Sequence, residues 1–138
     1  MNRQELQELS KIRRKEVSAL LKAKQYCGAY YLLGYSIECA LKACIAKQTK
    51  KYDFPDKDLV TKAYVHNLEQ LIKLAGLEKD LEQDTRKNKM LELNWAIVKD
   101  WKETSRYDIN ISRSDAKDLY SACTSHTNGI LSWIKTKW

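Results

Sequence analysis

Apolar residues recur with a helical period along residues 26–47, YCGAYYLLGYSIECALKACIAK, which is the longest weakly charged segment of the chain. One stripe advances in steps of four, three, four and three residues and consists of Tyr30, Gly34, Ile37, Leu41 and Cys44. Residues at this spacing lie on one face of a helix. The pattern therefore predicts a long helix at the centre of a helical bundle.

A second stripe follows the same steps one residue later and consists of Tyr31, Tyr35, Glu38 and Lys42. Glu and Lys are seldom buried without partners, so their place beside an apolar face needs an explanation. An exposed ion pair between residues four apart would contribute about 0.2–0.5 kcal/mol. The alternative is a partly buried carboxylate that anchors a basic residue from another helix, and we expect Glu38 to hold Arg106 in this way.

The rest of the chain predicts five further helices. They are expected over residues 2–25, from Pro55 to about 64, from His66 or Asn67 to about 75, from 77 to about 104, and over 115–135. A hinge at 25–28 separates the first two long helices. Gly76 lies just past the end of the short helix that begins at His66 or Asn67, and Ser112 or Ser114 caps the last helix. We expect an all-α fold: a single domain over 1–138, built as an up-and-down antiparallel bundle of four main helices plus one short helix.

Composition supports this fold class and limits the type of partner. The 138 residues include only four Gly and one Pro, too few turn formers for a many-stranded sheet. The charged N-terminal segment does not resemble a signal peptide, and no apolar run reaches the roughly 18 residues of a membrane span, so we expect a cytoplasmic protein without a membrane partner. The net charge of +7 favours a polyanion such as RNA or a nucleotide.

Cysteines and sequence motifs point to no metal or cofactor. The four cysteines form no CxxC pair, and no histidine is placed to complete a local zinc-ligand pattern, which predicts free thiols. Gly-rich phosphate loops, HExxH and GxSxG are absent from the sequence.

Three sites outside the central segment are candidates for ligand binding or catalysis. Arg106 and Tyr107 follow the predicted end of a helix, where the guanidinium can bind phosphate, cap its own helix or pair with Glu38. His66 begins a helix and serves either as a capping or packing residue or in catalysis. On the first helix, a basic cluster is either a solvated face or a phosphate-binding surface, and it consists of Lys11, Arg13, Arg14 and Lys15.

Three segments resemble the HEPN family of helical proteins: AYYLLGYSIECALKACIAK at 29–47, HNLEQLIKLAG at 66–76, and W-x4-RY at 101–107. The resemblance extends over nearly the whole chain. It implies a helical bundle that commonly forms a homodimer and is often encoded beside a minimal nucleotidyltransferase. Many members are ribonucleases that cleave RNA without metal, using an Arg-x(4 to 6)-His motif across the dimer interface.

The chain departs from that ribonuclease motif, because none of its six arginines has a histidine at the required spacing. General acid–base catalysis supplies about 10²- to 10⁴-fold in rate, so its loss favours binding over cleavage. We expect an RNA- or nucleotide-binding module of a toxin–antitoxin or nucleotidyltransferase-associated system. Its ligand site would consist of Arg106, Tyr107, Glu38, Lys42, Tyr35 and Tyr31. A metal-independent endoribonuclease using Arg106, His66 or Tyr107 is the alternative, and a structural partner subunit without a ligand is the second alternative.

Overall fold

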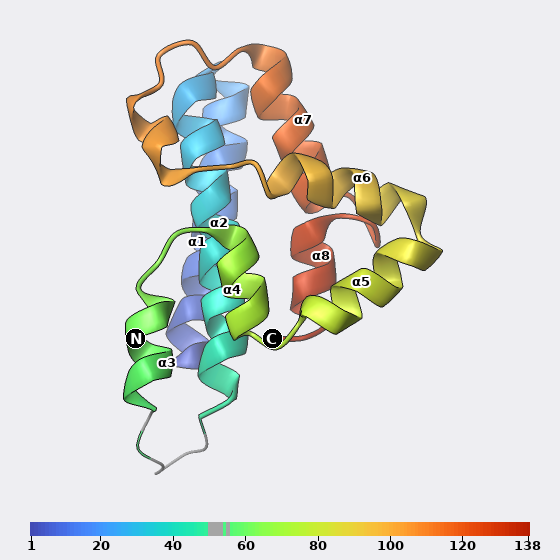
Figure 1. The fold of residues 1–138 in the computed structure, drawn as a ribbon. Helices are drawn as coiled ribbons and strands as arrows, with labels where there is room; N and C mark the ends of the chain where they lie inside the picture. The colour runs from blue at the N-terminus through green and yellow to red at the C-terminus, as the bar shows by residue number, and fades with distance from the viewer. Residues whose placement is uncertain (50–53, 55) are drawn as a thin grey trace.

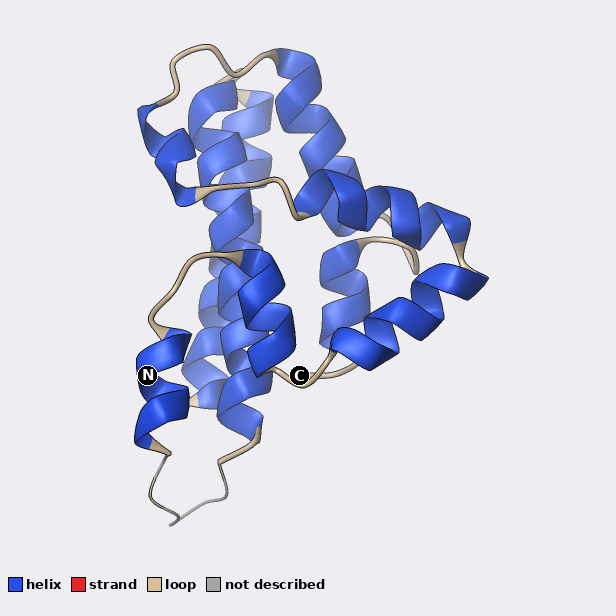
Figure 2. Ribbon diagram, in the orientation of Figure 1, coloured by secondary structure: helices blue, strands red, loops and turns tan. Residues whose placement is uncertain are grey.

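The computed structural model describes residues 1–49, 54 and 56–138, and these residues form helices joined by short loops, without a strand (Figures 1 and 2). The elements are α1 (Arg3–Lys22), α2 (Tyr26–Lys47), α3 (Lys57–Ala63), α4 (Leu68–Leu74), α5 (Glu78–Lys87), α6 (Lys89–Val98), the 3-10 helix η1 (Glu103–Tyr107), α7 (Arg113–Thr124) and α8 (Ile130–Lys135). The predicted all-α fold class is confirmed. None of the described helices combines the length and apolar character that crossing a bilayer requires.

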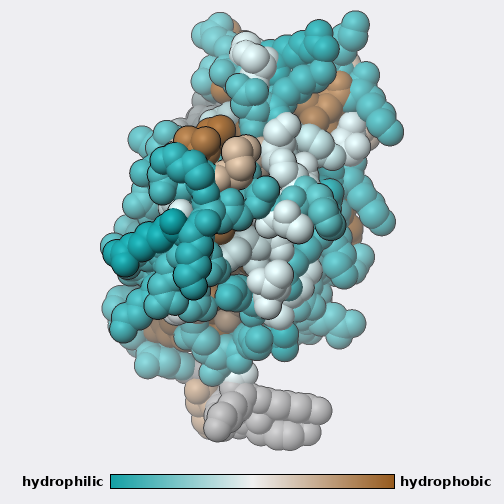
Figure 3. Space-filling model, turned by 90° about the vertical axis from the view of Figure 1, so that its right-hand side faces the viewer, coloured by the Kyte–Doolittle hydropathy of each residue, from teal (hydrophilic) through white to brown (hydrophobic). Residues whose placement is uncertain are grey.

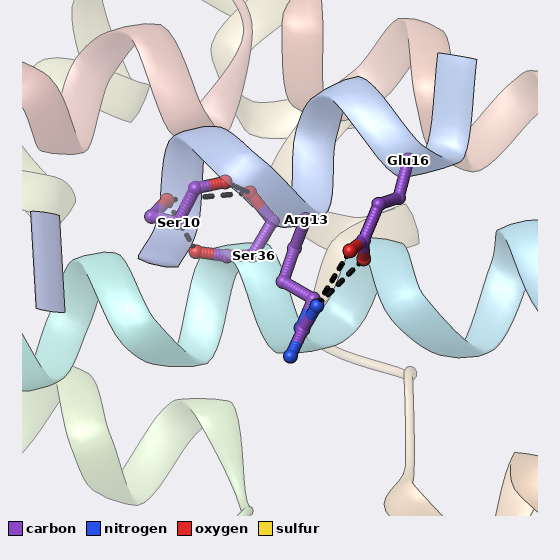
Figure 4. Close-up of polar contacts among 4 residues, drawn as sticks. All are labelled: Ser10, Arg13, Glu16 and Ser36. Carbon is purple, nitrogen blue, oxygen red and sulfur yellow. Dashed lines mark hydrogen bonds and ion pairs between the residues drawn. The ribbon is translucent and has the colours of Figure 1, made fainter. Parts of the chain in front are cut away.

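Helices α1 and α2 form a long hairpin, and they run side by side in Figure 1. Asn2 caps α1, and the chain reverses at Lys24, whose φ of 60° lies in the left-handed region, just before the hinge predicted at 25–28. Between the two helices, the hydroxyls of the fully buried Ser10 and Ser36 each donate to the other residue's carbonyl, at 2.7 and 2.8 Å (Figure 4). These bonds fix the register of α2 on α1.

Helix α2 is the central element, and its bounds are those the sequence predicted. Its core side chains include Leu33, Ile37 and Leu41, none of which is exposed. Helices α1, α4, α7, α8 and η1 all pack on it. The apolar stripe therefore lies at the centre of the core, as expected.

The long helix predicted from 77 to about 104 is wrong, because Asn88 divides it. Asn88 has φ −132° and ψ 99°, ends α5 and caps α6 by accepting from the N–H of Leu91. Its amide also donates to the side chain of Asn128 at 2.7 Å. The apolar spacing continues through this position, but the chain turns sharply, and α5 and α6 form a corner (Figure 1).

The last predicted helix, 115–135, is also two helices. Ser112 caps α7 through a capping box with Asp115, as expected for one of the two proposed caps. The turn between α7 and α8 is so tight that a Cβ at Gly129 would lie 2.6 Å from the carbonyl oxygens of Cys123 and Ser125. The number of main helices in the predicted bundle was therefore too small.

The connection from α2 to α4 carries the short helix α3. Pro55, predicted to open this helix, lies outside the described residues, and Asp56 is the N-cap. Asn67 caps α4, and Gly76, with φ 72°, follows its end as predicted. Helix α4 packs on α2, so the loop before α4 runs beside the second stripe of α2 (Figure 1).

Candidate functional site

The second stripe of α2 meets two segments that are distant in the sequence: the loop before α4, which carries His66, and the turn η1, which carries Arg106. The η1 turn is held on α2 by Trp101, whose side chain is 2% exposed and lies against Gly34. Only a residue without a side chain leaves room for the indole there. Trp101 was not among the residues predicted for the site, although it is the residue that positions η1.

Glu38 is a buried carboxylate with two cationic or protonatable neighbours. Its side chain is 5% exposed, and its Oε1 lies 2.5 Å from Nδ1 of His66. The ammonium of Lys42 lies 3.9 Å from the other carboxylate oxygen. A buried carboxylate needs such partners, because removing it from water without them costs several kcal/mol. Glu38 is therefore the partly buried anchor that the sequence suggested, but its main partner is a histidine.

The predicted pairing of Glu38 with Arg106 is wrong. Among the described residues, Arg106 forms no ion pair with a carboxylate. Its guanidinium lies over the ring of Tyr107, 4.8 Å from the centroid, and the phenols of Tyr107 and then Tyr31 raise its pKa above the usual value. Tyr31 precedes Glu38 by seven residues, or about 10 Å of helix, so the tyrosine that Arg106 contacts lies about two turns from the residue that carries the carboxylate.

Tyr35 connects the two ends of this face. Its ring packs edge-on against Tyr31, Trp101 and His66, with centroid distances of 4.9, 5.4 and 5.8 Å. Burial first, then the Tyr31 hydroxyl and the negative charge of Glu38, raise the pKa of the Tyr35 phenol, while Arg106 lowers it. The phenol therefore stays protonated at neutral pH and can donate a hydrogen bond.

The face so formed, which we call the α2–η1 face, comprises Tyr31, Tyr35, Glu38, Lys42, His66, Arg106 and Tyr107. It has a buried carboxylate paired with a partly exposed histidine at one end and an exposed, charged arginine at the other, separated by two phenols. The residues chosen from the sequence are thus brought to one surface, although their pairing differs. The 43% exposed side chain of His66 leaves its second ring nitrogen available to a ligand, since Nδ1 faces Glu38.

A hollow of about 220 Å³ lies between Tyr30 of α2 and the segment that joins α6 to α7. It is lined by Tyr30, Asp100, Lys102, Thr104, Ser105, Asp108 and Ile111. Burial, then Asp115 and the two lining aspartates, raise the pKa of the Tyr30 phenol. None of the predicted ligand-binding residues lines this hollow.

Within the described part of the chain, no three His, Cys, Asp or Glu side chains come together as metal ligands would. The cysteines are free thiols: Cys39, Cys44 and Cys123 are buried and Cys27 is half-buried. Burial raises the pKa of Cys39 and of Cys44 to about 11.

Comparison of the chain with protein-family models, with curated proteins and with solved structures found no match. The likeness to the HEPN family therefore stays a prediction from the residues that carry it.

Proposed function

We propose that the chain is an HEPN-like module that binds RNA or a nucleotide on the α2–η1 face, as a component of a toxin–antitoxin or nucleotidyltransferase-associated system. The observation that carries the proposal is Arg106, an exposed guanidinium without a carboxylate partner among the described residues, held beside two tyrosines. Arginine binds phosphate through a planar fork of donors, and phenol rings accept stacked bases. The positive net charge attracts the same ligand.

The binding test uses fluorescence titration with a short unstructured RNA and, separately, with ATP at low salt. A charge-assisted hydrogen bond contributes about 1.5–3 kcal/mol, so Arg106→Gln should weaken binding by about ten- to a hundredfold. Arg86→Gln is the matched control, because this exposed arginine of α5 carries the same charge and pairs with Glu82. Equal binding by both variants and the parent protein would refute the assignment of Arg106.

The resemblance also supports two partners, a second copy of the chain and a minimal nucleotidyltransferase. Sedimentation of the purified protein tests the homodimer. Co-expression with a neighbouring nucleotidyltransferase, followed by capture of one chain through a tag on the other, tests the hetero-complex. A monomer that captures no nucleotidyltransferase would refute both partners without affecting the binding test.

A second candidate function, metal-independent endoribonuclease, is favoured by the Glu38–His66 pair. In the neutral imidazole whose Nδ1–H donates to Glu38, Nε2 of His66 is unprotonated and can accept a proton from a ribose 2′-hydroxyl. The alkoxide would attack the adjacent phosphate, a P–O bond would form, and the bond to the 5′-oxygen would break, leaving a 2′,3′-cyclic phosphate. The leaving oxygen takes a proton from water or from an acid on the face, while Arg106 binds the phosphate.

Cleavage is tested by incubating labelled RNA with the protein in EDTA and identifying the 3′-end of the product. The proposal expects a 2′,3′-cyclic phosphate and loss of cleavage in His66→Ala and in Glu38→Gln. A contaminating nuclease would cleave equally in all samples. If the parent protein binds RNA but does not cleave it, the endoribonuclease proposal is refuted and the binding proposal is kept.

A further inference from the structure

A second group of cations gathers around Trp138, which follows α8, at residues that do not belong to the α2–η1 face. The ammonium groups of Lys11 on α1 and Lys135 on α8 both lie over the ring of Trp138, 5.9 and 5.7 Å from its centroid. Arg3 donates a hydrogen bond of 2.7 Å to the backbone oxygen of Trp138, which holds the main chain of this residue near the start of α1. An aromatic ring attracts cations through its face, so Trp138 keeps two ammonium groups close together.

The positive charges of this group are poorly compensated. Burial, and then the like charges of Arg14 and Lys11, lower the pKa of Lys135. In the described parts of the chain, neither Arg14 nor Lys135 pairs with a carboxylate, and Lys11 has only the exposed Glu8 at 3.9 Å. By contrast, the nearby Arg13 is neutralised by Glu16 through contacts of 2.8 and 2.7 Å (Figure 4). A bound anion would relieve the repulsion among Lys11, Arg14 and Lys135.

We propose that Lys11 and Lys135, whose ammonium groups lie over Trp138, together with Arg14, three residues after Lys11 on α1, form a second binding surface for the phosphates of single-stranded RNA. We call it the Trp138 cluster. Cations beside a partly exposed aromatic ring are the combination that single-strand binding proteins use, since the cations hold the backbone and the ring meets the bases. The choice of RNA rests on the proposed function, whereas the location of the cluster does not.

The cluster decides between the two ligands of the proposed function. It lies on α1 and the C-terminal end of the chain, while the first surface lies on α2, the loop before α4 and η1. A mononucleotide touches one surface only, whereas a strand of several nucleotides can touch both. The protein should therefore bind an RNA strand more tightly than ATP.

On the face shown in Figure 3, the brown apolar side chains form small, separate patches among teal hydrophilic and white intermediate side chains.

The test is fluorescence anisotropy with a labelled, unstructured RNA of about 12 nucleotides between about 50 and about 200 mM salt. Lys11→Gln combined with Lys135→Gln should weaken RNA binding about tenfold and reduce the slope of log K against log salt by about 1.4, because each lost phosphate contact removes about 0.7. ATP binding should not change. Replacing the same two lysines by arginine should restore RNA binding, since the charge is kept.

The matched control is Lys87→Gln combined with Lys99→Gln, which removes the same charge from exposed positions on α5 and after α6. Equal RNA binding by the cluster and control variants would overturn the proposal, and so would an equal loss of ATP and RNA binding in the cluster variant. Loss of RNA binding in the cluster variant alone, with Arg106→Gln binding normally, would uphold the cluster and refute the α2–η1 face.

Discussion

Replacing Gly34 by alanine should destabilise the fold by overpacking one contact. A Cβ at this position would lie 1.8, 2.0 and 2.3 Å from Cε2, Cδ2 and Nε1 of Trp101. The indole is 2% exposed, so it has no free space into which to move. Overpacking of a core costs about 1–3 kcal/mol, and these contacts call for the upper end of that range.

Alanine is more favourable than glycine in a helix interior by about 0.5–1 kcal/mol, and this gain offsets part of the cost of overpacking. The net loss expected for Gly34→Ala is therefore about 2 kcal/mol. Gly28→Ala is the control in the same helix, because its new Cβ would meet only Leu20 Cδ1 at 3.6 Å, an ordinary contact. That variant should gain about 0.5–1 kcal/mol.

Urea denaturation followed by circular dichroism measures both variants, and their free energies of unfolding should differ by about 3 kcal/mol. Since Trp101 precedes η1, Gly34→Ala should also weaken the binding that depends on Arg106. Equal stability of the two alanine variants would show that α2 and the indole separate at little cost, and would refute the packing described for this position.

Three further predictions concern the α1–α2 hairpin, the thiols and the α7 cap. Ser36→Ala should lower the free energy of unfolding by about 1–3 kcal/mol in urea denaturation. Adding Ser10→Ala to that variant should lower it by less than Ser10→Ala does alone, because both hydroxyls belong to one buried pair, and additive losses would contradict this. At pH 8, a thiol-specific reagent should modify the half-buried Cys27 well before the buried Cys39, whose pKa of about 11 keeps its thiol neutral. Equal rates of modification at the two cysteines would refute the burial of Cys39. Hydrogen bonds from the α7 N-cap lower the pKa of Asp115, so its contribution to stability is present above about pH 4 and is lost as pH falls through the lowered pKa. The melting temperatures of the parent protein and of Asp115→Asn should therefore converge in acid, and a difference that stays constant with pH would contradict this.

The sequence was sufficient to predict the helices whose signals are local. The period of the apolar stripe located α2, and side-chain caps at Asn67 and Ser112 marked the starts of α4 and α7. It did not locate the break at Asn88, because apolar spacing is preserved across the corner and asparagine also occurs inside helices. The turn before Gly129 had a visible signal, the run SHTNG at 125–129, which contains several turn-forming residues.

The candidate face was predicted in its membership but not in its pairing. Glu38 and His66 are separated by 28 residues, and whether they meet depends on the path of the connection before α4, which has no local sequence signal. Arg106 was expected at the carboxylate, but the packing of Trp101 on α2 places it beside Tyr31 instead. Both differences arise from tertiary packing, which residue spacing along a single helix does not encode.

The hydrogen bond between Asn88 and Asn128 joins the corner of α5 and α6 to the corner of α7 and α8. Helices α5 and α8 are tied again by the Trp133 indole, which donates to Asp84 at 2.8 Å, and by Lys137 near Asp80 at 3.5 Å. Opening either corner breaks the same bonds, so α5 and α8 should unfold as one cooperative unit. Their amide protons would then exchange with solvent together, while those of the α1–α2 hairpin exchange more slowly.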